Sequence, residues 1–329
     1  MLDLKEFIDN QLSCWPLAKA NYDNLEQAIF KDVYLSESER IRLVCLPARI
    51  ASSSARITAK GQVDRPCFLC SHRLPSEQKA LDYGDFHILV NPFPVFTQHF
   101  TLPSKQHRRQ AILPVKEVFF QVLQDIDDSF VLFFNGALCG ASAPDHLHFQ
   151  IGQKNRMPLQ ADGIESRHLY PIVESKQVNV YELQDFSRQA WIIKSTDVQA
   201  SAFWLESICQ AFAQIEGGKA KVGGKAQFAA DPDFEAQDKI NVVAWREKDM
   251  LTTIIFPRAA HRPSCYFTED EEHRIVTSPA SVEMMGYYIL PRQEDFVKAD
   301  AELLREIYTE VSLSPERTRA ISEAITKEI

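Results

Sequence analysis

The chain has 329 residues, of which 45% are hydrophobic and 25% charged, with a formal net charge of −9. This length allows two domains with cores of their own, and the composition is that of a globular protein. The acidic balance argues against binding a nucleic-acid polymer, which needs a basic face, and no run reaches the roughly 18 apolar residues of a membrane span. The N-terminal residues lack the pattern of a secretory signal, so we expect a cytoplasmic protein.

The first half of the sequence predicts several strands and two helical regions. Residues 1–30 have apolar side chains at helical spacing, with a break near Pro16. Residues 114–126 carry a helical apolar stripe with a proline at its start, where the missing N–H is harmless. The expected strands are 29–34, 41–46, 86–90, 99–102, 130–134 and 146–151. This mixture predicts an α+β fold.

A second unit is expected after the polar stretch 153–167. The pattern predicts a strand at 191–194, a helix at 202–215, strands at 240–245 and 251–256, and two terminal helices from Ala299. The glycine-rich stretch 217–224 is expected to be a loop. Residues 87–106 and 273–293 share a faint pattern of two strand-like runs around a proline. This echo indicates either an internal duplication or one hairpin pattern that arose twice by chance.

The segment 135–152, NGALCGASAPDHLHFQIG, is the most informative part of the chain. Alternation along a strand would place His146, His148 and Gln150 on one face and the apolar residues between them on the other. A loop of small residues that includes Gly140 and Ser142 comes just before. Such a surface could receive a phosphate, although an edge strand facing solvent would show the same alternation without any function.

Two further features carry chemistry. Cys67-Phe-Leu-Cys70 has the spacing of two thiolates that clasp one zinc ion, but a redox pair or two unrelated thiols are alternatives. The histidines that could complete a zinc site are His72, His99, His107 and His146. A small basic island at Lys105, Arg108 and Arg109 suits a small phosphorylated ligand better than a polymer, with a solvated basic loop as the alternative.

Taken together, these segments resemble a known family. Residues 140–150, GASAPDHLHFQ, resemble the active-site signature of the galactose-1-phosphate uridylyltransferase branch of the histidine-triad superfamily, in which Gln replaces the last His of the triad. Residues 46–56, the Cys-x-x-Cys pair and residues 90–107 are similar to that family in the same order. The likeness covers residues 40–155 well and the C-terminal half loosely, through residues 278–296, which resemble the GDP-hexose phosphorylases.

The resemblance implies an α+β fold of the histidine-triad type, with an antiparallel sheet, flanking helices and two related halves. Residues 1–160 would form the catalytic domain, and residues 161–329 a second domain that completes the substrate pocket. The resemblance also implies that His148 is the nucleophile and that the protein forms a homodimer. The residues that it assigns to a structural Zn²⁺ ion are Cys67, Cys70, His107 and His146.

A neutral imidazole suits the expected chemistry, because at pH 7 most of a histidine with an ordinary pKa is unprotonated. One nitrogen of His148 would attack the α-phosphorus of a nucleotide, and the other would hold its proton against an acceptor such as a backbone carbonyl. Gln150 can donate a hydrogen bond but cannot protonate a leaving group. We therefore expect a good leaving group, with phosphate or a sugar phosphate rather than water as the acceptor, in a ping-pong cycle.

Several other residues are expected to hold the phosphates or the rest of the substrate. These candidates are Arg49, Asn91, Lys105, Asn135, Ser142 and the amides around Gly140. Some have plainer roles available, because Asn135-Gly136 is also a turn signal and Arg49 could pair with a surface acid.

We expect a nucleotidyltransferase of the phosphorylase type acting on a nucleoside diphosphate sugar, with GDP-hexose favoured. The alternatives are a dinucleoside polyphosphate phosphorylase, a histidine-triad nucleotide hydrolase, and a zinc-stabilised nucleotide-binding protein without turnover. Gln150 argues against the hydrolase, and the retained His148 argues against a protein that only binds.

Overall fold

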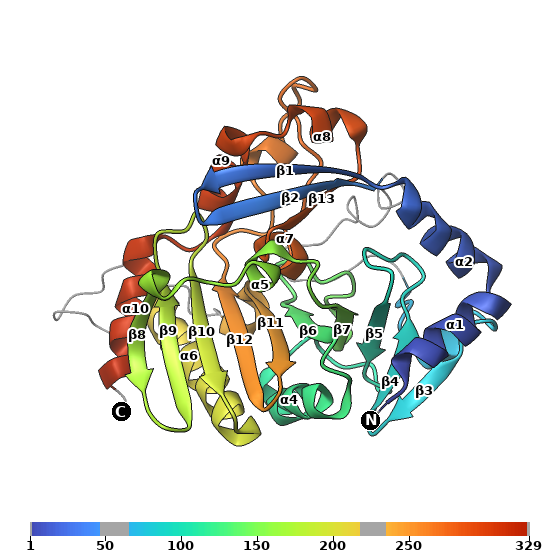
Figure 1. The fold of residues 1–329 in the computed structure, drawn as a ribbon, viewed down its shortest axis with the longest axis horizontal. Coiled ribbons are helices and arrows are strands. Elements are labelled where there is room, and N and C mark those ends of the chain that lie inside the picture. The colour runs from blue at the N-terminus through green and yellow to red at the C-terminus, as the bar shows by residue number, and fades with distance from the viewer. Residues whose placement is uncertain (1, 47–65, 218–234, 328–329) are drawn as a thin grey trace.

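The structure of the protein, a computed structural model, describes residues 2–46, 66–217 and 235–327. In these ranges the chain forms a ten-stranded antiparallel sheet, a separate three-stranded sheet, and helices on both sides of the larger sheet (Figure 1). The predicted α+β fold is therefore confirmed. Arg49 lies outside the described residues, so its predicted contact with substrate stays a prediction.

The smaller sheet consists of β1 (Ile29–Ser36), β2 (Glu39–Cys45) and β13 (Tyr287–Leu290), in that order. The strands of the larger sheet are β3 (Ala80–Tyr83), β4 (Phe86–Val90), β5 (His99–Pro103), β6 (Phe130–Asn135), β7 (His148–Gln153), β8 (Leu169–Glu174), β9 (Val178–Leu183), β10 (Ala190–Ser195), β11 (Ile240–Glu247) and β12 (Met250–Pro257). The helices are α1 (Leu4–Cys14), α2 (Pro16–Asp23), α4 (Lys116–Asp125), α5 (Pro158–Ala161), α6 (Val198–Glu216), α7 (Ser281–Met284), α8 (Gln293–Lys298), α9 (Ala301–Val311) and α10 (Pro315–Lys327).

Most elements predicted from periodicity are present, with ends shifted by a few residues. Pro16 does divide the N-terminal helical region, because it occupies the first position of α2. The strands β3, β8 and β9 were not predicted, and β13 was indicated only as the second strand-like run of residues 273–293. They are short or mixed in polarity, and β8 contains a proline. The predicted loop at 217–224 lies outside the described residues apart from Gly217, which caps α6.

The order of strands in the larger sheet repeats. From one edge to the centre the order is β3-β4-β5-β7-β6, and from the other edge it is β8-β9-β10-β12-β11. A long helix precedes the central hairpin in both cases, α4 before β6 and α6 before β11. The two halves meet where β6 pairs with β11. This repeat supports the predicted pair of related halves, and the boundary predicted at residue 160 falls in α5, between β7 and β8.

The sequence echo that suggested the duplication is, however, the wrong one. By strand order the counterpart of β4 and β5 is the pair β9 and β10. Residues 273–293 instead contain α7 and β13, which lies in the smaller sheet and pairs in parallel with β2. The likeness between residues 87–106 and 273–293 is therefore a chance resemblance between short hairpin-like runs.

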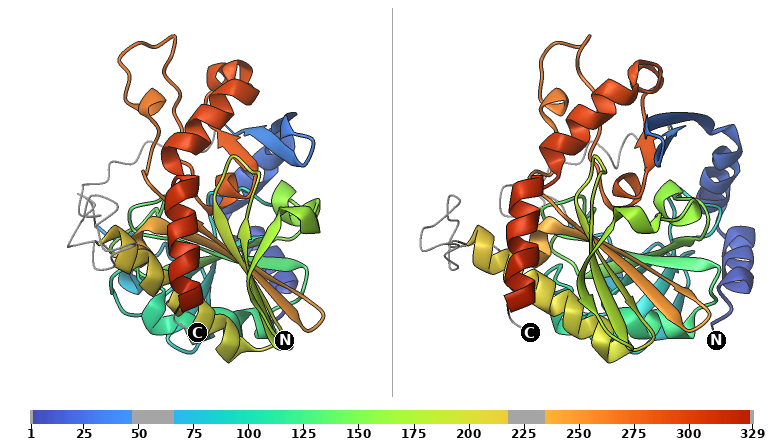
Figure 2. Two further views of the ribbon diagram at one scale, coloured as in Figure 1. Left: turned by 90° about the vertical axis from the view of Figure 1, so that its left-hand side faces the viewer. Right: turned by 60° about the vertical axis from the view of Figure 1, so that its left-hand side comes forward.

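The larger sheet separates two hydrophobic cores. The helices α4 and α6 pack on one face, next to Phe149 and Ile151 of β7. Figure 2 shows α6 and the C-terminal helix α10 beside each other on one side of the sheet, in yellow and red. The opposite face carries Phe133 and Ile254 and is covered by the smaller sheet and by α7 and α9. The residues of the candidate site lie on this second face.

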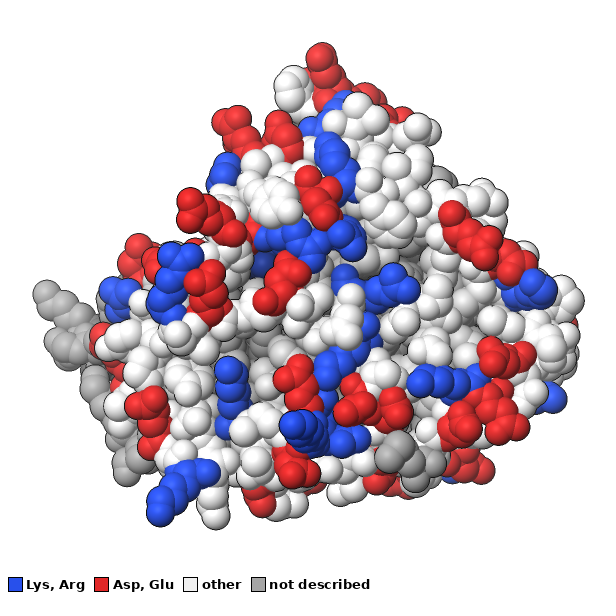
Figure 3. Space-filling model, in the orientation of Figure 1, with Lys and Arg blue, Asp and Glu red and all other residues white. Residues whose placement is uncertain are grey.

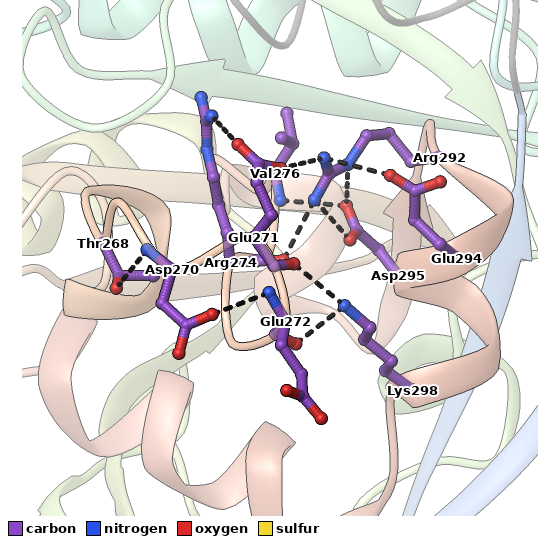
Figure 4. A network of polar contacts seen from close by, with 10 residues as sticks. All are labelled: Thr268, Asp270, Glu271, Glu272, Arg274, Val276, Arg292, Glu294, Asp295 and Lys298. Atoms are coloured by element: carbon purple, nitrogen blue, oxygen red, sulfur yellow. Dashed lines mark hydrogen bonds and ion pairs between the residues drawn. The ribbon is translucent and has the colours of Figure 1, made fainter.

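A polar network fixes the segment between β12 and β13 (Figure 4). Arg292 donates to both carboxylate oxygens of Asp295, at 2.7 and 2.9 Å, and to the carbonyl of Arg274 at 2.9 Å. The buried Asp295 also accepts from the backbone N–H of Val276 at 2.9 Å. Lys298 donates to the carbonyls of Glu271 and Glu272. The network ties the loop between β12 and α7 to α8.

The surface charges agree with the acidic composition. On the face drawn in Figure 3, basic and acidic side chains are interspersed, and no broad basic surface is visible. Among the described residues, no helix combines the length and the apolar character needed to cross a bilayer.

Candidate active site

The strand β7 lies inside the sheet, between β5 and β6, so the alternative of a solvent-facing edge strand is wrong. His148 is its first residue and is 2% exposed. Its Nδ1 lies 2.8 Å from the carbonyl of His146, and this contact assigns the proton to Nδ1. Its Nε2 is buried and has no hydrogen-bond partner among the described residues. Burial lowers the pKa of His148 to about 4. The ring is therefore neutral, with an unshared electron pair on Nε2.

Gln150 lies two residues further along the same face, and His99 of β5 orients its carboxamide. The backbone N–H of Val95 donates to Nδ1 of His99 at 3.2 Å, so Nε2 of His99 carries the proton. That nitrogen lies 3.0 Å from Oε1 of Gln150. The amide oxygen of Gln150 is thus an acceptor, and its Nε2 donates to no group in the described part of the chain. His99 therefore acts on the site through Gln150 and is not a zinc ligand.

Asn91 contacts residues next to Gln150, and it makes no hydrogen bond to His148 in the described part of the chain. Its Nδ2 donates to Oγ1 of Thr101 at 3.2 Å, and its Oδ1 accepts from the N–H of Phe93 at 2.9 Å. Thr101 is the cross-strand neighbour of Gln150. The structure therefore brings Asn91 to the Gln150 side of the site, and its role in substrate binding stays a prediction.

Gln110 is a buried residue that sequence reasoning missed. The pairing of β6 with β7 runs from Phe130 to Phe133 and stops before Asn135 and His148 would face each other. The side chain of Gln110 bridges this gap. Its Oε1 accepts from the N–H of His148 at 2.7 Å, and its Nε2 donates to the carbonyls of Asn135 and His148 at 2.9 and 3.1 Å. The side-chain amide of Gln110 thus replaces the backbone hydrogen bonds that β6 and β7 do not form at the position of His148.

Asn135, the last residue of β6, has its carboxamide oxygen fully engaged. Oδ1 accepts from Nδ2 of Asn241 at 2.8 Å, from the N–H of Ser281 at 2.8 Å and from its hydroxyl at 2.6 Å. Nδ2 of Asn135 is the other end of this amide, and it donates to no group in the ranges that the structure covers. The two residues that fix Asn135 come from the C-terminal half, and no local sequence signal identifies them.

The loop between β6 and β7 needs glycine where it touches the second half. A Cβ atom on Gly136 would lie 2.5 Å from the carbonyl oxygen of Asp238. Gly140 has a φ of +101°, and its Cβ would lie 2.5 Å from that of Ala280. The predicted small-residue loop is therefore real, and its small residues permit close packing against the C-terminal half.

The four predicted zinc ligands converge. The donor atoms of Cys67, Cys70, His107 and His146 all lie within 4.8 Å of one another. Sγ of Cys67 is 3.2 Å from Nδ1 of His146, and Sγ of Cys70 is 3.2 Å from Nδ1 of His107. Donor atoms around a tetrahedral zinc ion lie roughly 3.3–3.8 Å apart. The two 3.2 Å contacts are close to this range, so the four side chains could hold a zinc ion, and the exposed His72 does not belong to the cluster.

The far nitrogens of both histidines support this assignment. Nε2 of His146 lies 2.8 Å from the carbonyl of Ser104, and Nε2 of His107 lies 3.3 Å from a carboxylate oxygen of Asp145. Such partners hold the proton on the far nitrogen and leave Nδ1 free to bind a metal. Since His146 precedes β7 by two residues, a metal ion held by these four residues would anchor the start of the strand that carries His148.

Two predicted residues make no hydrogen bond or ion pair with His148 in the described part of the chain. Lys105 pairs with Asp82 of the edge strand β3, at 2.7 Å. Ser142 is exposed in the loop before β7. For both residues, a role in substrate binding stays a prediction.

Two family models match the sequence. Residues 7–153 match a domain of unknown function, DUF4922, and residues 247–329 match the GDPGP1-like C-terminal domain. No curated protein sequence matches the chain.

Solved structures of the yeast Ap4A phosphorylase are similar over nearly the whole chain. One covers 95% of this chain and 98% of that chain, with 14% identity and a TM-score of 0.59. The complex with AMP covers 95% and 97%, with 15% identity and a TM-score of 0.57. The complex with Ap4A covers 92% and 97%, with 13% identity and a TM-score of 0.53. At such identities the similarity concerns the fold.

The implied fold is thereby confirmed by a comparison that does not depend on the short motifs. The chain has the fold of the yeast Ap4A phosphorylase, and its residues 247–329 match the model of the GDPGP1-like C-terminal domain.

Proposed function

We propose that this protein is a nucleotidyltransferase of the phosphorylase type, which cleaves a nucleoside diphosphate sugar through a covalent intermediate on His148. The observation that carries the proposal is the state of the His148 ring. Its Nδ1 proton is held by a backbone carbonyl, and its Nε2 has no partner among the described residues. A neutral imidazole held in this tautomer is prepared for nucleophilic attack.

In the first step Nε2 would attack the α-phosphorus of the nucleotide. The new bond joins nitrogen to phosphorus, and the bond from the α-phosphorus to the bridging oxygen breaks, so that hexose 1-phosphate leaves with that oxygen. In the second step an oxygen of inorganic phosphate would attack the same phosphorus and displace His148. The products are hexose 1-phosphate and a nucleoside diphosphate, and the enzyme returns unchanged.

Gln150 and Asn135 would stabilise the charge on the phosphoryl oxygens. Both carboxamides have their oxygen engaged by neighbours, so each would present its NH₂ group as a donor. Neither can supply a proton to the leaving group. A sugar phosphate leaves without such help, whereas hydrolysis of a poorer leaving group would require an acid.

The metal cluster would be structural. Cys67, Cys70, His107 and His146 would supply four protein ligands, which fill a tetrahedral site and leave no open position for chemistry. A bound zinc ion would hold the Cys-x-x-Cys loop and the residues before β7 together. The zinc would thus position His148 without touching the substrate.

The sugar nucleotide is favoured by the C-terminal match. Residues 247–329 match a GDPGP1-like domain, so we propose GDP-hexose as the substrate, with phosphate as the acceptor. A second candidate substrate is Ap4A. The similarity to the Ap4A phosphorylase over 95% of the chain favours it.

One experiment separates these activities. The protein is incubated with GDP-hexose or Ap4A, with and without phosphate, and the products and the intact mass of the protein are measured. Phosphate-dependent release of GDP supports the proposed function, and phosphate-dependent release of ADP supports the second candidate. GMP or AMP formed without phosphate would indicate hydrolysis. Bound nucleotide with neither turnover nor a mass adduct would refute both enzyme activities.

The role of His148 is tested with a matched pair of variants. His148→Ala should abolish the nucleotidyl adduct and turnover. His273→Ala, at an exposed histidine bonded to Asp270, should leave both unchanged. Turnover that survives His148→Ala would refute the covalent mechanism.

A further inference from the structure

The two halves of the protein meet at a row of polar side chains. His148 begins β7 and Asn135 ends β6. Asn135 is the cross-strand neighbour of Asn241 in β11, across the junction of the two halves. Asn241 is fully buried, and its Nδ2 donates to Oδ1 of Asn135 and to the carbonyl of Cys139, both at 2.8 Å. The C-terminal half thus reaches the candidate site through this amide.

Behind Asn241 lies a buried cation, Arg258, which is 1% exposed. Its Nη1 donates to Oδ1 of Asn241 at 2.6 Å. Its other acceptors are the carbonyls of Val311, Pro279, Ala260 and His261. All of them are neutral, and no carboxylate of the described residues lies within ion-pair distance of Arg258, although the buried Glu283 acts on its charge from further away. A buried charge without a direct counter-ion is costly, so the field of Arg258 is expected to stabilise an anion nearby.

The hydrogen bonds between Arg258 and the site all point in one direction. The guanidinium donates to Asn241, and the amide of Asn241 donates to Asn135. Each donor polarises the next amide, so positive charge is displaced along the chain toward Nδ2 of Asn135. Reversal of the Asn135 amide is prevented, since it would turn Nδ2 against the donors of Asn241 and Ser281.

We propose that Arg258 and Asn241 are positioning residues for phosphoryl transfer. They fix the carboxamide of Asn135 and direct the charge of the buried guanidinium to the phosphate that His148 attacks. The site in the first half is therefore incomplete without the second half, although His148 and Gln150 both belong to the first. This inference rests on the proposed function.

We call the hydrogen bonds from Arg258 to Asn241 and from Asn241 to Asn135 the relay. The substitution Asn241→Asp tests this relay with little change in the shape of the side chain. The new carboxylate keeps an acceptor for Arg258 and gives it a counter-ion, so the buried arginine stays satisfied. It removes the donor to Asn135, however, and neutralises the charge that the relay carries. Asn10→Asp, at an exposed position of α1, makes the same change in charge and serves as the control.

The readout is the rate of adduct formation on His148 in a single turnover at saturating GDP-hexose. We expect Asn241→Asp to lower this rate roughly tenfold to hundredfold, the range for a lost charge-assisted hydrogen bond. In an Asn135→Ala background the same substitution should change the rate less than about threefold, because its effect passes through Asn135. If Asn241→Asp lowered the rate by the same factor in both backgrounds, the relay would be overturned. A structural defect that does not act through Asn135 would lower the rate independently of the Asn135→Ala substitution.

Two controls keep the result interpretable. Thermal unfolding shows whether each variant is folded, and if Asn241→Asp is not, Ser281→Ala replaces it in the same cycle. Ser281 donates to Asn135 from the same side. A wild-type protein that forms no adduct would contradict the proposed function itself. A wild type that forms the adduct, with an Asn241→Asp variant equally fast, would overturn only the relay.

Discussion

Replacing Gln110 by leucine should destabilise the protein and misplace its nucleophile. Leucine has nearly the same volume, so the substitution leaves no large cavity. The substitution does leave three backbone groups without their hydrogen-bond partner. These groups are the N–H of His148, the carbonyl of His148 and the carbonyl of Asn135. These groups are buried between β6 and β7, where the ladder between the strands has already ended.

The magnitude follows from these three groups. A buried polar group without its partner costs about 1–3 kcal/mol. The lower end applies here, because the ends of the two strands can relax toward each other. We therefore expect the free energy of unfolding to fall by about 3 kcal/mol. Adduct formation on His148 should slow as well, since the backbone that carries the ring is no longer held.

Urea denaturation at neutral pH measures the first effect, and single-turnover adduct formation measures the second. Gln121→Leu is the matched control, because Gln121 is exposed on α4 and its side chain donates a hydrogen bond to Asp125. Its effect should stay within about 0.5 kcal/mol. A loss below about 1 kcal/mol for Gln110→Leu would show that Gln110 does not substitute for the ladder.

Three further predictions concern the metal, a glycine and acid stability. Elemental analysis should find about one zinc per chain in the wild type and almost none in Cys70→Ser, and the variant should have a lower melting temperature. A wild type that contains no metal and has the same melting temperature as Cys70→Ser would contradict the assignment. Gly140→Ala should lower the free energy of unfolding by about 3 kcal/mol in urea denaturation, and Ala280→Gly should restore part of it by removing the Cβ contact. Burial and the nearby Arg262 and Arg258 charges lower the pKa of His261 to about 4, below the ordinary 6.5. Between these two pKa values His261 is protonated in the unfolded chain and neutral in the folded chain. The free energy of unfolding should therefore fall as the pH drops from about 6.5 to 4, by up to about 3 kcal/mol. Urea denaturation should show a shallower fall for His261→Asn, and an equal fall would rule out this histidine as the cause.

Short-range patterns were enough to predict much of the site. Alternation in HLHFQ identified the shared face of His148 and Gln150, and the chemistry of imidazole required an acceptor for one nitrogen, which the carbonyl of His146 provides. The Cys-x-x-Cys spacing indicated half of a metal site. Choosing between the histidines that could complete it took the family resemblance, and the geometry agrees with His107 and His146.

The sequence alone determined the fold class and the residues whose role depends on neighbours a few positions away, because strand and helix periodicities act over that range. Only the tertiary structure decided which distant residues complete the site. Gln110 meets His148 from a loop 38 residues away, and Asn241 meets Asn135 across 106 residues. The register of β6 against β11 sets this meeting, and register is fixed by the packing of a whole face rather than by any local signal. For the same reason the true repeat became visible in the order of the strands, while the sequence echo pointed to the wrong segment.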